Sequence, residues 1–576
     1  MQPRCGFSFR TASAVLVLCS GLLVGEGLAA EGPQVTFGGD VVPPSSVTAE
    51  QLRAIVPYLS NPAMQLAFTK SLGLPDLAGK PVVQKVVGSD GTAPDGSGPV
   101  AETNGVTPLR VDVASDFDRM VTGDSTSILG QQHNPSIAVN PLDDNLLVAV
   151  AENTHSITGN PQDCTVYLSV DGGDSYFYFF DLPITAANSC GSPRVAYSPD
   201  GVALYVAYLE YTSGPLIGSP TAPLARFQAY NGFSLSGPTS SATISGGVFD
   251  SPTLGVHAYG GPGAQKVYFG FTYFSGSSCT VYLDALSSYG TVGSLIPLGT
   301  SSACTGGAPL TERLVQGASI VGGPANQVLA CWFDSGVDGY STPVQTSPPA
   351  PPTPVVPLNK FNIACRSSNN LGVTFAGNVL PPESVNPPDY TRWIYAAKGV
   401  SSELPYWLGP NGLWFYTGAS QYPSLAIDHL GNAHVVFSFN PSPGNRFKSE
   451  AANVAYVKSI DPVPTTLLPT IYSKWSGKSV VGTGAGGQLF PVVATQHVHE
   501  SSKPYVYVGW LDTSASMKLG AANANTIYDA RYRLSTSGGP AFGKTIVASD
   551  HASTTDYISV GNYLGATANP GIFHFV

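Results

Sequence analysis

Charged residues are scarce in this chain of 576 residues, of which Asp, Glu, Lys and Arg together make up 11%. Basic residues number 26 against 37 acidic ones, so the net charge at pH 7 is −11. That balance argues against a phosphate-backbone partner and gives no reason to expect attraction to an anionic membrane. Beyond its first 30 residues the chain also lacks an apolar run of the ~18 residues that a membrane helix needs. The sequence thus predicts neither a nucleic-acid partner nor membrane insertion.

Common metal-binding and catalytic patterns are missing as well. The chain has no C-x-x-C pair, no H-E-x-x-H, no G-x-S-x-G and no phosphate-binding glycine loop that opens a helix. The stretch HVHE brings His497, His499 and Glu500 together, and we interpret it as a solvent-facing loop rather than a metal site. We therefore expect no resident cofactor and no dedicated metal centre.

What the chain has in abundance is Gly, Pro, Tyr and Phe, with 64, 49, 28 and 25 residues. This composition is typical of a turn-rich, all-β protein. At the N-terminus, Arg4 and Arg10 precede the apolar run AVLVLCSGLLVG, and the small residues Ala29 and Ala30 follow it. This is the pattern of a secretory signal peptide over residues 1–30. We expect the mature protein to be secreted, either to the extracellular space or to the periplasm.

Two further segments precede the main body of the chain. Residues 31–83 contain two stretches with helix-capping residues, which predict a small, partly helical N-terminal segment. Residues 84–105 are rich in Gly, Ser, Pro and Asp and are interpreted as a flexible linker. The role of the first segment is not readable from its residues.

Six cysteines remain outside the predicted signal peptide. In an exported protein we expect them to form disulfides. Six cysteines permit 15 pairings, and we favour pairing of sequence neighbours because each bond would then join adjacent strands. The predicted bonds are Cys164–Cys190, Cys279–Cys304 and Cys331–Cys365.

Residues 106–576 contain a repeat of two strand-like segments. The first segment reads NPSIAVNP, SPRVAYSPDG, SPTLGVHAYG, YPSLAIDHLG and FPVVATQHVH, with GASIVGG as a weaker copy. Each is followed by a run rich in β-branched and aromatic residues, such as ALYVAYLEY and YVYVGWLDT. The period of about 60 residues fits four-stranded blades with long loops, which predicts a β-propeller. We expect seven blades, the last one joining the C-terminal GNYLGATANPGIFHFV to residues 108–115; six blades is the alternative.

Three stretches share the spacing Ser-x-Asp-x-Gly or a close variant of it. They are SVDGGDSY with Ser169, Asp171 and Gly173, SSNNLGVTF with Ser368, Asn370 and Gly372, and the degenerate STSGGPAF. This spacing resembles the Asp-box of the sialidase-like β-propeller superfamily, also known as the BNR repeat. The resemblance covers residues 106–576 and implies that these turns are structural, on the face opposite an active site. The F/Y-R-I-P motif of sialidases is absent, so their catalytic residues are not carried over.

Four of the second strands carry an acidic residue at their eighth position. In a propeller this end of the strand lies on the face opposite the Asp-box turns, where residues at the start of the first strands also gather. The sequence thus predicts a ring of carboxylates that binds sugar hydroxyls or a cation, or that supplies the acid and base of glycoside cleavage. The alternative is that these acids form local ion pairs at strand ends. The predicted catalytic residues are Glu152, Glu210, Asp334 and Asp512, and the predicted binding residues are His133, Arg194, Asp250 and Arg313.

Two functions are consistent with these patterns. The first is a secreted, sialidase-like propeller that binds extracellular glycans or acts on them as a glycoside hydrolase. The second is a non-catalytic extracellular or cell-surface scaffold that contacts a surface protein. The fold resemblance and the acids favour the first function, whereas the missing sialidase motif favours the second. Whether the protein is an enzyme is left open by the sequence.

Overall fold

The structure, a computed structural model, describes residues 34–37, 131–154, 162–185, 188–212, 224–231, 240–257, 266–287, 295–302, 304, 313–324, 326–335, 361–376, 394–400, 406–408, 414–416, 418–441, 452–460, 474–483, 487–497, 501–512, 527–548, 553–554, 566–569 and 572–575. The described residues are almost all in strands or turns, and the one helical element among them is the 3-10 turn η3 (Gly418–Gln421). None of the described elements is a helix long and apolar enough to span a membrane.

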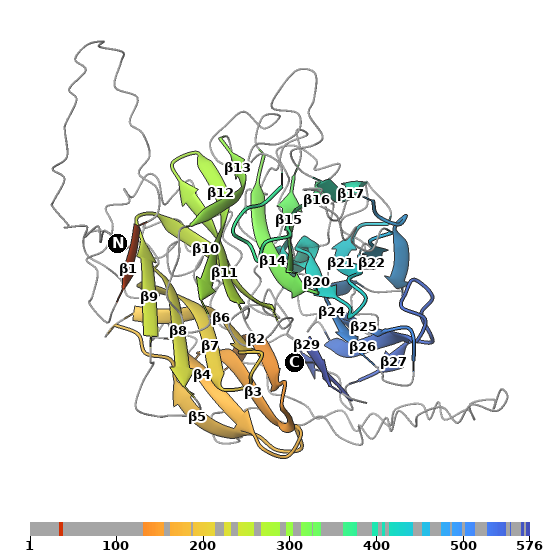
Figure 1. Cartoon of the computed structure of the whole chain (residues 1–576), viewed down its shortest axis with the longest axis horizontal. Helices are drawn as coiled ribbons and strands as arrows, with labels where there is room; N and C mark the ends of the chain where they lie inside the picture. Colours follow the sequence, from red (N-terminus) through yellow and green to blue (C-terminus); the bar gives the residue numbers. More distant parts are fainter. Residues whose placement is uncertain are drawn as a thin grey trace, which may run out of the picture. The chain divides into compact units, whose positions relative to one another are not determined.

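Six antiparallel four-stranded sheets form the blades of a β-propeller (Figure 1). From the inner strand outward, blade 1 contains β2 (Gln131–Asn140), β3 (Asp143–Thr154), β4 (Gln162–Ser169) and β5 (Phe177–Asp181). Blade 2 contains β6 (Asn188–Tyr197), β7 (Ala203–Thr212), β8 (Leu224–Asn231) and β9 (Ser240–Ser245). Blade 3 contains β10 (Val248–His257), β11 (Lys266–Ser275), β12 (Ser278–Ser287) and β13 (Ile296–Ser301).

The second half of the ring repeats this order. Blade 4 contains β14 (Val315–Gly323), β15 (Gln327–Asp334), β16 (Phe361–Ser368) and β17 (Ile394–Val400). Blade 5 contains β20 (Ser424–Ile427), β21 (Ala433–Phe439), β22 (Asn453–Lys458) and β23 (Ser479–Gly482). Blade 6 contains β24 (Gln488–Gln496), β25 (Tyr505–Asp512), β26 (Ile527–Ser535) and β27 (Ile546–Val547), with β28 (Ser553–Thr554) pairing with β26. A separate hairpin, β18 (Tyr406–Leu408) with β19 (Trp414–Tyr416), follows blade 4.

The all-β propeller predicted from the repeat is confirmed, and its number of four-stranded blades is six rather than the expected seven. The C-terminal segment forms only a two-stranded hairpin, β29 (Ala566–Asn569) with β30 (Ile572–Phe575). Strand β29 lies against both β24 of blade 6 and β2 of blade 1, and thus closes the ring where a seventh blade was expected. Residues 108–115, the expected partner of this segment, lie outside the described residues.

The predicted, partly helical N-terminal segment contains one short strand, which precedes its two stretches with helix-capping residues. β1 (Gln34–Phe37) pairs antiparallel with β9 and becomes a fifth, outermost strand of blade 2. The rest of residues 31–83, the linker and the predicted signal peptide lie outside the described residues.

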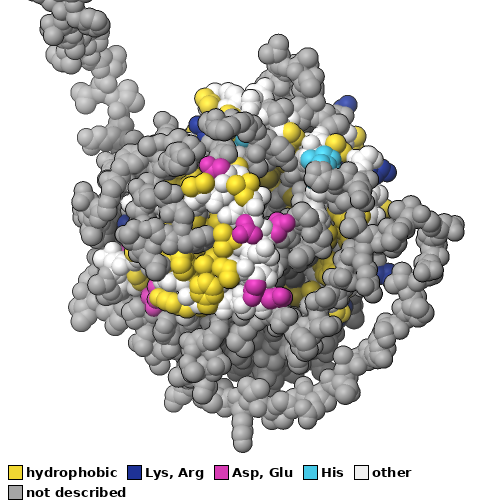
Figure 2. Space-filling view, turned by 60° about the horizontal axis from the view of Figure 1, so that its bottom comes forward, with side chains coloured by type: hydrophobic (Ala, Val, Ile, Leu, Met, Phe, Trp, Pro, Cys, Tyr) yellow, Lys and Arg dark blue, Asp and Glu magenta, His cyan; other side chains and the backbone are white. Residues whose placement is uncertain are grey.

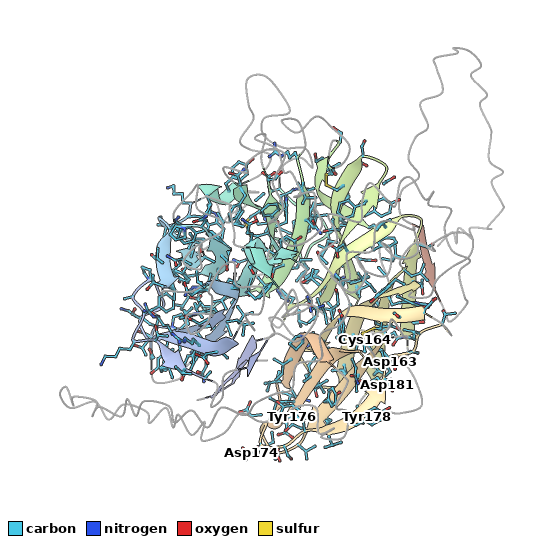
Figure 3. All side chains as sticks on the ribbon, turned by 180° about the vertical axis from the view of Figure 1, so that it is seen from behind. Asp163, Cys164, Asp174, Tyr176, Tyr178 and Asp181 are labelled. Atoms are coloured by element: carbon cyan, nitrogen blue, oxygen red, sulfur yellow. A yellow bond between two sulfur atoms is a disulfide. The ribbon has the colours of Figure 1, made fainter. Side chains whose placement is uncertain are left out.

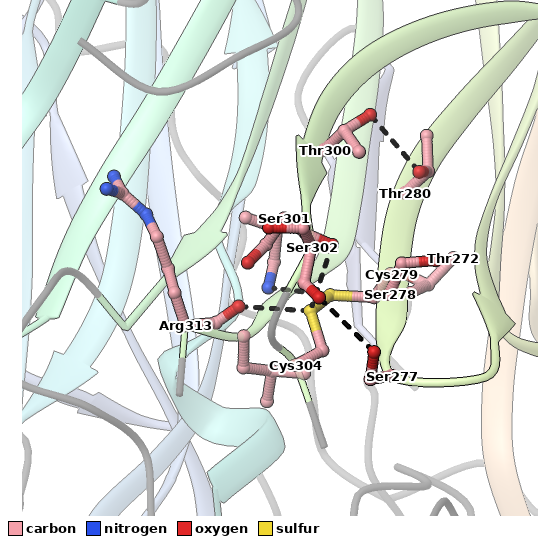
Figure 4. Close-up of a disulfide and its surroundings, with 12 residues drawn as sticks. Thr272, Ser277, Ser278, Cys279, Thr280, Thr300, Ser301, Ser302, Cys304 and Arg313 are labelled. Carbon is pink, nitrogen blue, oxygen red and sulfur yellow. Dashed lines mark hydrogen bonds between the residues drawn. A yellow bond between two sulfur atoms is a disulfide. The ribbon is translucent and has the colours of Figure 1, made fainter. Parts of the chain in front are cut away.

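All three predicted disulfides are present. Cys331 and Cys365 face one another on the adjacent strands β15 and β16. We had expected each bond to join adjacent strands, but the other two bonds do not join neighbouring strands of one sheet. Cys164–Cys190 connects β4 of blade 1 to β6 of blade 2. Cys279–Cys304 fixes the segment after β13 to β12, beside the carbonyl of Arg313 (Figure 4).

The inner strands share a local distortion that explains the repeated first segment. In five of them the register against the second strand shifts by one residue, which is a β-bulge. The extra residue has a positive φ in each case, between 50° and 66°. Proline follows it in four of the five strands, where its missing N–H does not break the ladder. The five bulge residues are Asn134, Ser192, Ser251, Gly317 and Phe490.

Candidate functional site

The bulges show that the four predicted catalytic acids are not equivalent. Glu210, Asp334 and Asp512 each pair with the second residue before a bulge residue, namely Cys190, Val315 and Gln488. Glu152 instead pairs with His133, the residue immediately before its bulge. Since side chains alternate along a strand, this offset of one residue turns Glu152 to the opposite face of its blade. Glu152 therefore does not share the register position that the other three predicted acids have in common.

Glu152 joins two blades. It is buried, and its Oε1 atom accepts a hydrogen bond of 2.6 Å from the side-chain amide of Asn134. The same atom accepts a hydrogen bond from the backbone N–H of Ser192, the bulge residue of the next blade. In blade 3, the hydroxyl of Thr272 occupies the same register position and accepts the N–H of Gly317 at 3.3 Å. Glu152 is thus one member of a set of polar residues that bind the next inner strand.

Glu210 lies in a buried ion pair with Arg226, whose Nε donates to Oε2 at 2.7 Å. The backbone N–H of Thr185 and the amide of Asn188 donate to its other oxygen at 2.8 and 2.6 Å. Burial acts to raise the pKa of this carboxyl. The hydrogen bonds and the guanidinium charge outweigh burial, and they hold the pKa of Glu210 below its usual value. A carboxyl in this state stays ionised at neutral pH and cannot serve as a general acid.

Asp334 and Asp512 are also paired with arginines. Arg313 binds Asp334 through two hydrogen bonds of 2.8 and 2.7 Å, and both side chains are buried. Asp512 lies 3.4 Å from a guanidinium nitrogen of Arg531 and accepts a 3.3 Å hydrogen bond from the amide of Gln488. The arrangement matches the alternative that these acids form local ion pairs at strand ends.

Three of the predicted binding residues have separate hydrogen-bond partners in the structure. Arg313 is the partner of Asp334, and Asp250 accepts a hydrogen bond from the amide of Gln316 in the next blade. The guanidinium of Arg194 donates to the carbonyl of the preceding residue at 2.9 Å. The backbone of His133 pairs with Glu152, and its side chain lies outside the described part. In the part of the chain that the structure describes, no three His, Cys, Asp or Glu side chains are grouped closely enough to hold a metal ion.

The Ser-x-Asp-x-Gly turns have a structural hydrogen-bond network. In the first turn, between β4 and β5, the hydroxyl of Ser169 donates to Asp171 and accepts the N–H of Gly173 at 2.9 Å. Hydrogen bonds from the side chain and the backbone of Ser175 lower the pKa of Asp171 to about 2. The turn after β16 repeats these bonds, with Ser368 accepting from Gly372 at 3.0 Å and Asn370 in place of the aspartate. These residues hold the connection between the third and fourth strands.

An exposed group of side chains on blade 1 was not among the predicted sites. Tyr178, on the outer strand β5, is 60% exposed, and its hydroxyl donates to Oδ2 of Asp181 at 3.2 Å. The other oxygen of Asp181 accepts the hydroxyl of Thr165 at 2.8 Å. Some burial, the charge and hydrogen bond of Asp181 and the charge of Asp163 raise the pKa of Tyr178. We name Asp163, Tyr178 and Asp181 the rim patch, whereas Thr165, which bonds to it, is buried; Figure 3 labels the three members along one side of this blade.

The register of β4 and β5 explains why the rim patch is exposed. Tyr178 and Asp181 lie on one face of the blade, while Phe177 and Phe180 lie on the other. Phe180 packs against Tyr230 of blade 2, with 5.0 Å between ring centroids. The rim patch thus occupies the face of β5 turned away from blade 2. Figure 2, which brings the bottom of the Figure 1 view forward, shows acidic side chains beside exposed hydrophobic ones on that side of the molecule. In the sequence, the run FYFFD directly after the first Ser-x-Asp-x-Gly turn is the pattern that could have indicated this exposed patch.

No protein-family model matches the chain, and no curated protein does either. Among solved structures it is similar to a Hadza microbial sialidase, with 10% identity over 76% of this chain and 61% of that chain and a TM-score of 0.33. The α-L-arabinofuranosidase Arb93A of Fusarium graminearum shows 10% identity over 69% of this chain and 92% of its own, with a TM-score of 0.35. The α-L-arabinanase of Penicillium chrysogenum shows 11% identity over 69% of this chain and 92% of its own, with a TM-score of 0.33.

These neighbours are named as a sialidase, an arabinofuranosidase and an arabinanase, and the chain spans less than two thirds of the length of the sialidase. At such identities and TM-scores no function follows from the similarity. The assignment of the fold rests on the strand order of the chain itself.

Proposed function

We propose that this protein is a secreted β-propeller that binds extracellular glycans at the rim patch of blade 1 without hydrolysing them. The observation that carries the proposal is the tethered, exposed ring of Tyr178 beside the exposed carboxylate of Asp181. An exposed aromatic face stacks against the apolar face of a sugar ring, and a carboxylate accepts hydrogen bonds from neighbouring sugar hydroxyls. The bond to Asp181 fixes the tyrosine before a ligand arrives, which lowers the entropy lost on binding.

The absence of hydrolysis is proposed from the state of the predicted catalytic acids. Glu152, Glu210, Asp334 and Asp512 are each at most 1% exposed. A general acid or base must come within about 2.6–3.2 Å of the atom whose proton it transfers. Carboxylates this deeply buried and engaged with arginine, amide or backbone groups do not meet that condition.

The secreted location is proposed from the predicted signal peptide, together with the three disulfides. Disulfides of this kind persist in oxidising compartments. We also assign the three Ser-x-Asp-x-Gly-like turns as Asp-boxes of the sialidase-like superfamily. The support is their common position after a third strand, and the serine that accepts the glycine N–H in each of them. In this assignment the superfamily supplies the scaffold, and the binding site is particular to this chain.

A glycan array with the mature protein tests the proposal. Tyr178→Ala and Asp181→Asn are each expected to lower the signal at least tenfold for the glycans that the wild type retains. Phe177→Ala is the matched control, because Phe177 is an exposed aromatic residue on the same strand but on the other face. Its binding should equal that of the wild type.

Three outcomes contradict the proposal. Unchanged binding in both rim variants would remove the rim patch as the site. If the wild type retains no glycan but binds a surface protein through Tyr178, the protein is a non-catalytic extracellular or cell-surface scaffold. Release of reducing sugar by the wild type, lost in Glu210→Gln, would make it a hydrolase.

A further inference from the structure

Two histidine rings meet between blades 5 and 6. His429 lies in the turn between β20 and β21, and His497 directly follows β24. Their ring centroids are 3.9 Å apart and the ring planes are inclined by 36°. Since the two residues come from different blades, tertiary packing rather than sequence proximity produces this contact.

The backbone on both sides of this contact is held in place. Asp428 fixes the turn that carries His429, because its Oδ1 accepts the backbone N–H of Asn432 at 2.8 Å. The hydroxyl of Thr495, two residues before His497, donates to the carbonyl of Ile427 at 3.2 Å and joins the two inner strands. The two rings are therefore presented by rigid elements, which favours a binding site over a chance contact.

The ring of His429 has a nitrogen available for a ligand. Its Nδ1 atom is buried from solvent and has no hydrogen-bond partner in the structure. A buried ring nitrogen without a partner costs free energy, and a metal ion that binds the nitrogen would remove this cost. Imidazole nitrogen is the commonest protein ligand of metal ions.

We infer that His429 and His497 form a two-imidazole site for a borderline divalent transition metal such as Zn²⁺ or Cu²⁺. Imidazole suits these ions, and water would complete their coordination. With Zn–N bonds of about 2.0–2.1 Å in tetrahedral geometry, two ring nitrogens lie about 3.4 Å apart and the ring centres about 5 Å apart. The rings need to separate by only about 1 Å from their present distance, and His497 is exposed to solvent. This site is independent of the glycan site on blade 1.

Metal titration of the mature, metal-stripped protein tests the inference. Zn²⁺ is followed by calorimetry, and Cu²⁺ by electron paramagnetic resonance, which counts the bound nitrogens. We expect one equivalent of metal bound by two nitrogens. His429→Gln and His497→Gln should each weaken binding at least tenfold and leave a one-nitrogen signal. The double variant keeps the other seven of the nine histidines and therefore reports on metal binding elsewhere in the chain.

The same variants show what would overturn the inference. Wild-type affinity in both single variants, or a two-nitrogen signal that survives in the double variant, would place the metal elsewhere. A wild type that binds no metal would reject the site directly. Melting curves without metal confirm that each variant is folded, and a Zn²⁺-dependent rise in Tm should be seen in the wild type but not in the double variant.

Discussion

The backbone N–H of Ser192 in blade 2 donates a hydrogen bond to Oε1 of Glu152 in blade 1. Two blades are thus joined at a bulge, by a side chain that sequence analysis placed among the catalytic acids. The amide of Asn134, in the bulge of blade 1, donates to the same oxygen. The bulges are therefore points of contact between blades as well as distortions within them.

Glu152→Ala should lower the free energy of unfolding by about 2–4 kcal/mol, because it leaves two buried donors without their acceptor. Glu152→Gln should cost less than half of that, since the amide oxygen can still accept both hydrogen bonds. Equilibrium unfolding in urea measures both variants. Equal stability of Glu152→Ala and the wild type would show that this contact between blades contributes nothing.

Arg313→Met should destabilise the protein by about 3–5 kcal/mol, because it leaves the carboxylate of Asp334 buried without its cation. Removing both charges in Arg313→Met with Asp334→Leu should recover most of the loss. Arg531→Met is the comparison: Arg531 is 24% exposed, lies 3.4 Å from Asp512 and is also paired with Asp529 at 3.2 Å, so its loss should cost less than that of Arg313. Urea unfolding should show a larger loss of stability in Arg313→Met than in Arg531→Met. The reverse order would contradict the prediction.

Gly372→Ala should destabilise the protein more than Gly276→Ala. Both glycines have positive φ, 79° and 58°, which costs alanine about 1–2 kcal/mol. A Cβ atom at Gly372 would also lie 2.9 Å from Cε1 of Tyr268 in the neighbouring blade, whereas a Cβ at Gly276 meets nothing within 4 Å. The difference between the two melting temperatures isolates the packing of this turn on blade 3. Identical melting temperatures would mean that the turn does not pack there in solution.

Stability should fall as the pH is lowered from about 7 to 5. Burial lowers the pKa of His434, and the bonds to Asp428 and Tyr456 hold its ring in the core. The unfolded chain takes up a proton at this histidine near pH 6.5, while the folded protein takes it up only at lower pH. The contribution of His434 to the free energy of unfolding is thus complete above about pH 6.5. It is lost as the pH falls toward the pKa that His434 has in the folded protein.

Urea unfolding at pH 7.5 and 5.5 measures this effect. The variant His434→Gln should show a shallower dependence on pH than the wild type. Some dependence should remain, because burial also lowers the pKa of His257. An unchanged slope in His434→Gln would show that His434 is not responsible.

The propeller was predictable because its inner strands repeat a local signal. Proline after the bulge residue marks the start of four of these strands, and the hydrophobic run of the second strand follows. The number of blades was not predictable, because two C-terminal strands fit equally well as half of a blade or as a hairpin. Only the contact of β29 with both β24 and β2 distinguishes these arrangements.

The site was predicted less well, for reasons of register. Counting positions from the start of each second-strand segment treats Glu152 and Glu210 as equivalent. The position of each bulge in the inner strand, however, decides which face of the blade a side chain at a given position occupies. An error of one residue in a strand exchanges its faces completely. Local ion pairs were predicted as the alternative, but the particular pairing of Asp334 with Arg313 was not, because the two residues are 21 positions apart and meet only through the sheet. Tyr178 was visible in the sequence, but its exposure depends on which face of β5 it occupies.

The hairpin β29–β30 also bears on the order of folding. Blade 1 begins at Gln131, yet its inner strand gains its last neighbour only when Ala566–Asn569 is in place. Contacts between segments so far apart in the chain form slowly, because a long loop must close first. As the chain folds, blades 1 to 5 can therefore stack one after another while the side of β2 that will contact β29 stays open. The slowest step of folding should be the arrival of this hairpin, and its release should be the first step of unfolding.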